Sequence, residues 1–191
     1  MIIIVISAFA VGCAGSVTLD IGYRPAWVSQ SPPTGIPGRR IQLGNISDPG
    51  GSTSLIGQRK AAFDAPMGNV FVSRPPSMVI RDAVAADLHR SGHMVVDTDP
   101  DIIVRGQVET FWIRTDVTPI YWDVVGEVRF TLELLDSNLS TILFKGTYQG
   151  NKVERTYLWP SEDIMKRVLE DALTAAVLQM SSDSNFVQAL R

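Results

Sequence analysis

Three segments between residues 102 and 150 alternate apolar and polar side chains, and they constrain the fold more than any other feature of the chain. These segments are residues 102–114, 124–135 and 142–150. Only short turns separate them, so we predict an antiparallel meander with one buried face and one face in water. On the first strand, we expect the buried face to carry Val104, Val108 and Trp112, and the wet face to carry Arg105 and Glu109.

Two other segments have the period of an amphipathic helix. Residues 77–90 repeat large apolar side chains every fourth position, and we predict that Ser77 caps this helix. Residues 161–180 carry a longer apolar stripe, with Ser161 as the expected cap. Shorter alternating segments predict further strands at residues 17–23, 41–46 and 93–97. This order predicts an α+β fold: a two-layer sandwich, with a mostly antiparallel sheet and two amphipathic helices on one face.

Length and charge limit the organisation of the chain. Its 191 residues carry a formal net charge of −3, and 45% of them are apolar. We therefore expect a single α+β domain over residues 41–191, preceded at residues 13–40 by an N-terminal strand and a Pro/Ser-rich connector. No basic run longer than two residues occurs, and this argues against a nucleic-acid partner.

The N-terminus begins with a short apolar run that ends at the only cysteine of the chain. Residues 2–12 are too few to span a bilayer, which takes about 20 residues in a helix, but they have the length of a signal-peptide core. The run ends in Ala10-Val11-Gly12-Cys13, which resembles the lipobox of bacterial lipoproteins. We predict that residues 1–12 are a signal peptide and that Cys13 is lipidated. No Lys or Arg precedes Cys13, so it stays open whether Met1 is the true start; the alternative is a buried first strand that contains Cys13.

The layout from Cys13 to Leu190 resembles the YajG family of bacterial lipoproteins. The segments that carry the resemblance are Ile56 to Lys60, Leu88 to Gly92, Gly106 to Val108, Gly126 to Leu134, Gly146 to Tyr148 and Asp183 to Leu190. The resemblance implies an envelope lipoprotein without a defined activity. It also implies a relation to α+β modules of transport-system auxiliary lipoproteins and of flagellar or Tol-associated periplasmic proteins. It does not explain the Pro-rich segment or residues 48–70.

Three acidic residues at alternate positions look like the start of a calcium-binding loop. They are Asp97, Asp99 and Asp101. An EF-hand loop needs Gly at its sixth position and a bidentate Glu at its twelfth, where this chain has Ile102 and Val108. We interpret the segment as an ordinary solvated turn.

The two histidines, His89 and His93, are four residues apart, a spacing that suits a metal ion on a continuous helix. Gly92 should end the helix between them, so we expect no zinc site and no other metal. The sequence has no nucleophile elbow and no phosphate-binding glycine loop, and we expect neither a cofactor nor an enzymatic activity. A Ser/His/Asp triad that forms only in space stays open.

Four aromatic residues, Phe111, Trp112, Tyr121 and Trp122, surround the predicted hairpin tip at residues 115–119. One interpretation is that they pack in the core and at its rim. The other is that they form an exposed interaction patch, which docks a protein partner or a lipid headgroup.

Together these features predict a lipid-anchored protein on the periplasmic face of the bacterial outer membrane. Ala14 is not Asp, which by the lipoprotein sorting rule favours the outer membrane. We expect a non-catalytic interaction or assembly module that binds an envelope protein or a second copy of itself. The alternative is an auxiliary lipoprotein of a lipid or solute transport system, with an apolar ligand held in a groove between helix and sheet.

Overall fold

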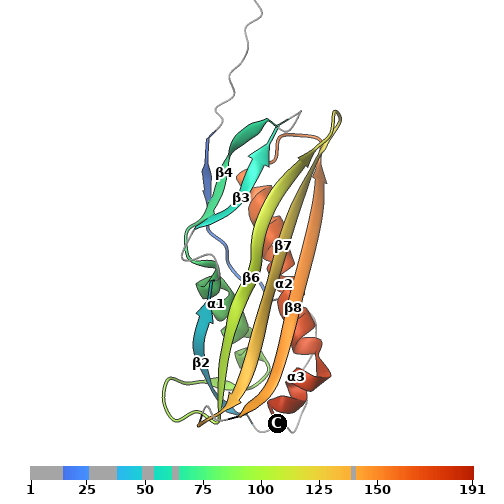
Figure 1. Cartoon of the computed structure of the whole chain (residues 1–191). Coiled ribbons are helices and arrows are strands. Elements are labelled where there is room, and N and C mark those ends of the chain that lie inside the picture. Colours follow the sequence, from blue (N-terminus) through green and yellow to red (C-terminus); the bar gives the residue numbers. More distant parts are fainter. Residues whose placement is uncertain (1–14, 26–37, 49–53, 62–64, 139–140) are drawn as a thin grey trace, which may run out of the picture.

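The computed structural model describes residues 15–25, 38–48, 54–61, 65–138 and 141–191 (Figure 1). The predicted signal peptide, Cys13 and most of the predicted connector lie outside these residues. The elements are β1 (Val17–Leu19), β2 (Arg40–Ser47), β3 (Leu55–Lys60), β4 (Pro66–Val72), α1 (Pro76–Arg90), β5 (Met94–Val95), β6 (Ile102–Val117), β7 (Trp122–Asp136), β8 (Ile142–Thr156), α2 (Glu162–Ser182) and α3 (Ser184–Ala189).

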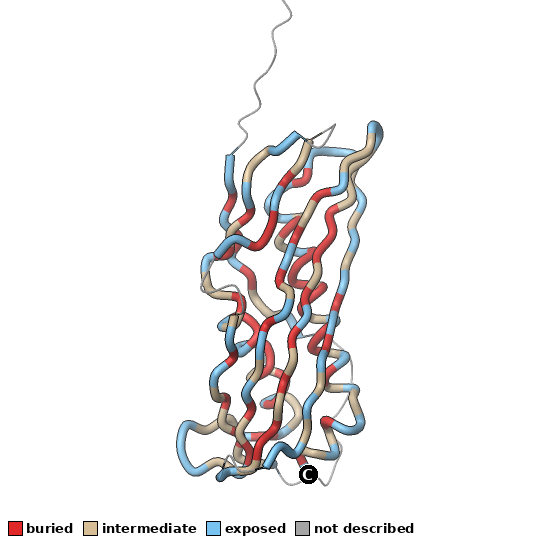
Figure 2. The backbone as a smooth tube through the Cα atoms, in the orientation of Figure 1, coloured by how far each residue is buried: buried red, intermediate tan, exposed pale blue. Residues whose placement is uncertain are grey.

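The predicted meander forms the main part of the sheet. β7 pairs with β6 and with β8, both antiparallel, along almost their whole length. Buried positions alternate with intermediate or exposed ones along most of β6 and β7, as Figure 2 shows, because successive side chains of a strand point to opposite faces. Apolar residues on one face therefore form the core, and the sequence predicted this part of the fold correctly.

The sheet as a whole is mixed, so the prediction of a mostly antiparallel sheet was wrong. β2 and β3 both pair with β6 in parallel, β2 beside its first half and β3 beside its last residues. Two further pairs are also parallel: β1 pairs with β4, and β2 pairs with β5. The pairing of β3 with β4 is antiparallel. The parallel pairing of β2 arises because α1 carries the chain back before β6 begins, as a crossover helix does.

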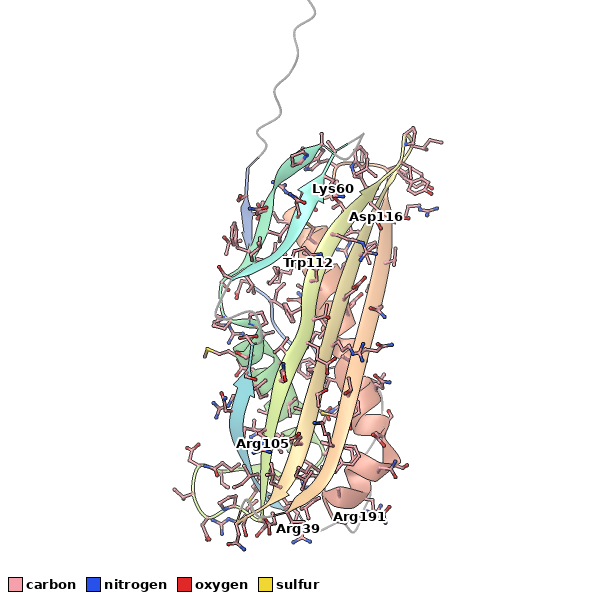
Figure 3. The ribbon with its side chains drawn as sticks, viewed as in Figure 1. Arg39, Lys60, Arg105, Trp112, Asp116 and Arg191 are labelled. Atoms are coloured by element: carbon pink, nitrogen blue, oxygen red, sulfur yellow. The ribbon has the colours of Figure 1, made fainter. Side chains whose placement is uncertain are left out.

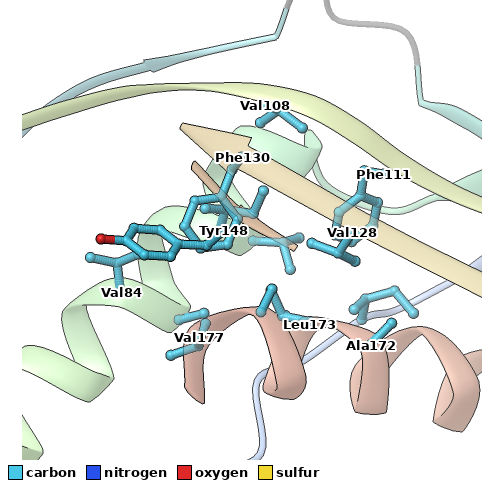
Figure 4. Close-up of a cluster of buried hydrophobic side chains, with 14 of the residues drawn as sticks. Val84, Val108, Phe111, Val128, Phe130, Tyr148, Ala172, Leu173 and Val177 are labelled. Atoms are coloured by element: carbon cyan, nitrogen blue, oxygen red, sulfur yellow. The ribbon is translucent and has the colours of Figure 1, made fainter. Parts of the chain in front are cut away.

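All three described helices lie behind the sheet in Figure 1, and α2 packs across β7 and β8. Two glycines permit this close packing. A Cβ atom on Gly150 would lie 2.6 Å from the backbone nitrogen of Ala176, and one on Gly126 would lie 3.1 Å from the carbonyl oxygen of Val168. Around this contact Phe130 and Tyr148 meet the apolar side chains of α2 (Figure 4). The result is a tightly filled interior.

β6 contains one irregularity that changes which side chains face the core. Its register with β7 shifts between Val108 and Thr110, so Glu109 is an extra residue, as in a β-bulge. Before the bulge the even-numbered positions face the core, and after it the odd-numbered ones do. Phe111 is consequently buried, and Trp112 lies on the outer face, opposite to our prediction.

The two long helices have different N-caps. The hydroxyl of Ser161 accepts a hydrogen bond from the backbone nitrogen of Ile164 at 3.3 Å, as predicted. Ser77, however, does not cap α1, whose N-cap position is Pro75. The carboxylate of Asp48 instead accepts a hydrogen bond from the Ser77 backbone nitrogen at 3.1 Å. A residue 29 positions earlier thus supplies the negative charge that favours a helix N-terminus.

The N-terminal segment is fixed to α2 by a buried carboxylate. Glu170 accepts a hydrogen bond from the backbone nitrogen of Gly22 at 3.1 Å and pairs with Arg24 at 3.1 Å. The hydroxyl of Thr174 donates to the carbonyl oxygen of Arg24 at 3.1 Å. Since β1 also pairs within the sheet, the residues before the connector belong to the same packed body as α2.

Candidate interaction surface

The chain topology brings several strand ends together at one end of the molecule. β6 and β8 end there and β7 begins there, because β7 runs antiparallel to both. The turn between β6 and β7 and the segment after β8 consequently lie side by side, at the top of Figure 1. They contribute six large apolar or aromatic side chains, which we call the aromatic end: Ile120, Tyr121, Trp122, Tyr157, Leu158 and Trp159.

Aromatic contacts join the two segments. The rings of Tyr121 and Tyr157 meet edge to face with centroids 6.4 Å apart, and those of Trp122 and Trp159 lie 6.2 Å apart. The guanidinium of Arg155 stacks 3.7 Å from the centroid of Tyr121, a cation–π geometry. These contacts fix the positions of the rings without covering them.

Much of the aromatic end is exposed to solvent. The exposed fraction is 73% for Ile120, 68% for Tyr157, 79% for Leu158 and 45% for Trp159. Single exposed apolar residues are ordinary on a protein surface, whereas a contiguous group of this size marks a site of interaction.

The predicted four-residue patch does not form as one surface. Phe111 is 7% exposed and lies in the core (Figure 4), while Trp112 lies on the outer face of β6, away from the hairpin tip near Asp116 (Figure 3). Only Tyr121 and Trp122 belong to the aromatic end. The other aromatic segment, Tyr157-Leu158-Trp159, was not predicted to belong to a surface patch. The available signal was a run of three large apolar residues just before Pro160, where the chain leaves a strand and should be polar.

The outer face of the sheet carries charged side chains, and many of them form ion pairs with opposite charges on the neighbouring strand. Glu133 accepts hydrogen bonds from Lys145 at 2.9 Å and from Arg105 at 2.8 Å, and both keep the pKa of Glu133 below its usual range. Arg129 pairs with Glu109 at 2.8 Å. Such cross-strand pairs are typical of a solvated sheet face. One hollow on this face is lined mostly by residues with polar or charged side chains: Ser47, Arg105, Gly106, Gln107, Thr131, Glu133 and Lys145.

In the acidic turn, the carboxylates of Asp99 and Asp101 bind Arg40 of the same protein. The carboxylate of Asp101 accepts a hydrogen bond from the backbone nitrogen of Arg40 at 2.9 Å, and the Asp99 carboxylate pairs with the Arg40 guanidinium at 2.6 Å. Asp99 has a left-handed backbone, with φ 54°, which fits a turn residue. These bonds hold the start of β2 beside the start of β6.

The two histidines occupy different environments. His89 is exposed in the last turn of α1, whereas His93 is buried after the helix has ended. Nδ1 of His93 accepts a hydrogen bond from the backbone nitrogen of Arg39 at 3.3 Å, which occupies one of its two possible ligand atoms. Within the described part of the chain, no three His, Cys, Asp or Glu side chains are grouped closely enough to hold a metal ion.

His93 should make stability depend on pH. Burial, and then the nearby Arg39 charge, lowers the pKa of His93 below 6.5. The unfolded chain therefore binds a proton before the folded protein does, and the free energy of unfolding should fall as the pH drops below 6.5. Denaturant titrations at about pH 7.5 and about pH 5.5 measure this loss, which His93→Gln should reduce. His89→Gln is the matched control, and an equal pH dependence in wild type and His93→Gln would contradict the prediction.

The fold and the aromatic end define a class of protein: an α+β domain with an apolar surface at one tip. Within the described residues, no helix is long and apolar enough to cross a membrane. The sequence profile of a family described as uncharacterized lipoproteins matches residues 56–191. The chain therefore belongs to this family of lipoproteins, while the narrower YajG assignment stays a prediction.

Similarity to solved structures extends over most of the chain. The crystal structure of protein XCC0632 from Xanthomonas campestris is similar with a TM-score of 0.56 at 12% identity, covering 91% of this chain and 95% of that one. An uncharacterized protein gives a TM-score of 0.48 at 12% identity, covering 87% and 97%. Lipoprotein GNA1162 from Neisseria meningitidis gives 0.39 at 13%, covering 75% and 99%. No curated protein matches the sequence. At these identities, the first similarity shows a shared fold.

Proposed function

We propose that this lipoprotein is anchored through Cys13 to the periplasmic face of the bacterial outer membrane and acts there as a non-catalytic interaction module. The observation that carries the proposal is the match to a lipoprotein family, in a chain whose only cysteine stands two residues before the packed domain. Gly15, where the described chain begins, already accepts a hydrogen bond from the buried Arg59. The domain would thus begin immediately after its anchor.

The charged groups of the domain support a non-catalytic role. Buried carboxylates already have internal partners: Glu170 binds Gly22 and Arg24, and Asp87 binds Arg90. Burial raises the pKa of Asp87, but this side chain sits under Arg90 and not in an open cleft. The perturbed groups are therefore engaged in structure.

The close packing of α2 favours the interaction module over the ligand-binding alternative. An apolar ligand would need space between α2 and the sheet, where Gly150 allows the helix backbone to touch the strand. Leu173, Ala176 and Val177 are completely buried at this contact. The apolar surface that the domain does offer lies outside, at the aromatic end.

Metabolic labelling with a fatty acid tests the anchor. We expect the wild-type protein to take up label and Cys13→Ser to take up none and remain in the uncleaved or soluble fraction. Ala14→Asp is a matched variant for location: it should keep the label but move to the inner membrane under the sorting rule on which the outer-membrane assignment rests. Absence of label on the wild type would refute the anchor.

A further inference from the structure

The start of the chain and the aromatic end lie at the same end of the molecule. β3 is parallel to β6, and β4 is antiparallel to β3, so β3 ends where β4 begins, at the end where β6 stops. β1 is parallel to β4 and must therefore begin there as well. Figure 1 shows this arrangement, with β1, the end of β3 and the β6–β7 turn all at the top.

A chain of contacts connects Gly15 to the aromatic end. Arg59 donates a hydrogen bond to the carbonyl oxygen of Gly15, and the next residue, Lys60, donates its backbone N–H to the Thr115 hydroxyl at 2.8 Å. Thr115 lies on β6 close to the turn. Three strand-to-strand steps, β1 to β4 to β3 to β6, correspond to a lateral distance of about 14 Å.

The bond geometry of the chain limits how far Cys13 can lie from this end. Two residues span at most about 7 Å between Cα atoms, so Cys13 is confined to the neighbourhood of Gly15. An acyl anchor on Cys13 would bring this end of the domain to the membrane surface.

We propose that the aromatic end is a membrane-contact surface that inserts its exposed side chains into the headgroup region beside the lipid anchor. Tyr and Trp favour the interface between water and hydrocarbon because each has an apolar ring and a polar group. Leu158 and Ile120, the most exposed apolar residues here, would reach deepest. This inference rests on the proposed anchor at Cys13 and adds a second contact to it.

The named charged residues around the aromatic end pair with one another, so we expect this end to contact a lipid surface whether or not the lipid is charged. Arg155 pairs with Asp123 at 2.8 Å, and Arg114 pairs with Asp116 at 3.3 Å. The Arg155 guanidinium also keeps the pKa of Asp123 below its usual range. These ions neutralise one another, so attraction to anionic lipid should contribute little, and binding should depend little on salt.

The test uses the full-length, lipidated protein with Trp159 as its only tryptophan, obtained by Trp27→Phe, Trp112→Phe and Trp122→Phe. The protein is reconstituted in vesicles of phosphatidylcholine brominated on the acyl chains, and in unbrominated vesicles. We expect a loss of Trp159 fluorescence in the brominated vesicles, equal at low and high salt. The matched control is Leu143→Trp in a background with all four tryptophans replaced by Phe. Leu143 is exposed at the start of β8, at the far end of the molecule, so its reporter should keep its fluorescence.

Fatty-acid label on the same preparations separates the two proposals. Label together with quenching of Trp159 supports the membrane contact. Label without quenching overturns the membrane contact and leaves the anchor standing. Quenching that salt abolishes also overturns it, because charge would then be the attraction. If sedimentation shows a dimer that Leu158→Ser dissociates, and Trp159 is not quenched, the aromatic end binds a second copy instead. Absence of label overturns both proposals.

Discussion

Gly150→Ala is expected to destabilise the protein by about 3 kcal/mol or more, the upper range for overpacking a core. The added Cβ would lie 2.6 Å from the backbone nitrogen of Ala176 and closer still to the carbonyl oxygen of Ala172. Both atoms belong to the helix backbone, which cannot rotate away as a side chain can. α2 must therefore shift from β8, and the loss extends to the apolar contacts around Tyr148. Urea unfolding followed by circular dichroism measures the change.

Gly22→Ala is the matched control for this substitution. A Cβ at Gly22 would have its nearest neighbour, the Glu170 carboxylate, at 3.8 Å, an ordinary contact distance. We expect the stability of this variant to lie within about 0.5 kcal/mol of wild type, as for substitutions away from any structural constraint. Equal stability of Gly150→Ala and Gly22→Ala would show that α2 does not need the glycine.

Glu170→Ala is expected to cost about 2 kcal/mol, in the range for losing hydrogen bonds to a buried charged group. The substitution removes the acceptor of the Gly22 backbone N–H and the partner of Arg24. The main effect should be local: the segment around Gly22 detaches from α2, and its amide exchanges hydrogen faster. Hydrogen exchange resolved at Gly22, together with urea unfolding, measures both quantities.

Two variants separate the contributions of the buried carboxylate. Glu170→Gln keeps an oxygen for the Gly22 N–H and should lose only about 1 kcal/mol. Arg24→Ala removes a side chain that is 75% exposed, and a surface ion pair of this kind contributes only about 0.5 kcal/mol. Arg24→Ala leaves the Gly22 hydrogen bond intact, so a loss as large as that of Glu170→Ala would mean that the ion pair, and not the backbone hydrogen bond, holds the segment.

Features that depend on the local period of apolar residues were predicted correctly from the sequence. Features that depend on residues far away in the chain were not. Strict alternation was sufficient for β7, and Ser161 with its acidic first turn was sufficient for the start of α2. The bulge at Glu109 is defined by pairing with β7, and within β6 the change from even to odd apolar positions is obscured because Phe111, Trp112 and Ile113 are all apolar. Likewise, Asp48 reaches the N-terminus of α1 from a remote segment, and a local capping rule selected Ser77 instead.

Only part of the aromatic end could be predicted from the sequence, for the same reason. Tyr121 and Trp122 stood out because they adjoin a predicted turn. Phe111 and Trp112 were grouped with them by closeness in sequence, although the bulge directs them to opposite faces. The residues after β8 reach the same end only because β8 runs parallel to β6, which follows from two successive antiparallel pairings. Topology rather than motif brings these residues together.

The length of β6 determines how far the domain can extend from its proposed anchor. Its 16 residues, at about 3.3 Å each, extend about 50 Å without a break. Because β7 and β8 run beside it, the strands form a stiff post rather than a hinged arm. With the aromatic end on the membrane, the opposite tip would stand about 50 Å above it. That tip carries Arg39, which donates to the carbonyl oxygen of Arg191, and the acidic turn that binds Arg40. A protein meeting this distal tip would be held at a fixed height over the lipid.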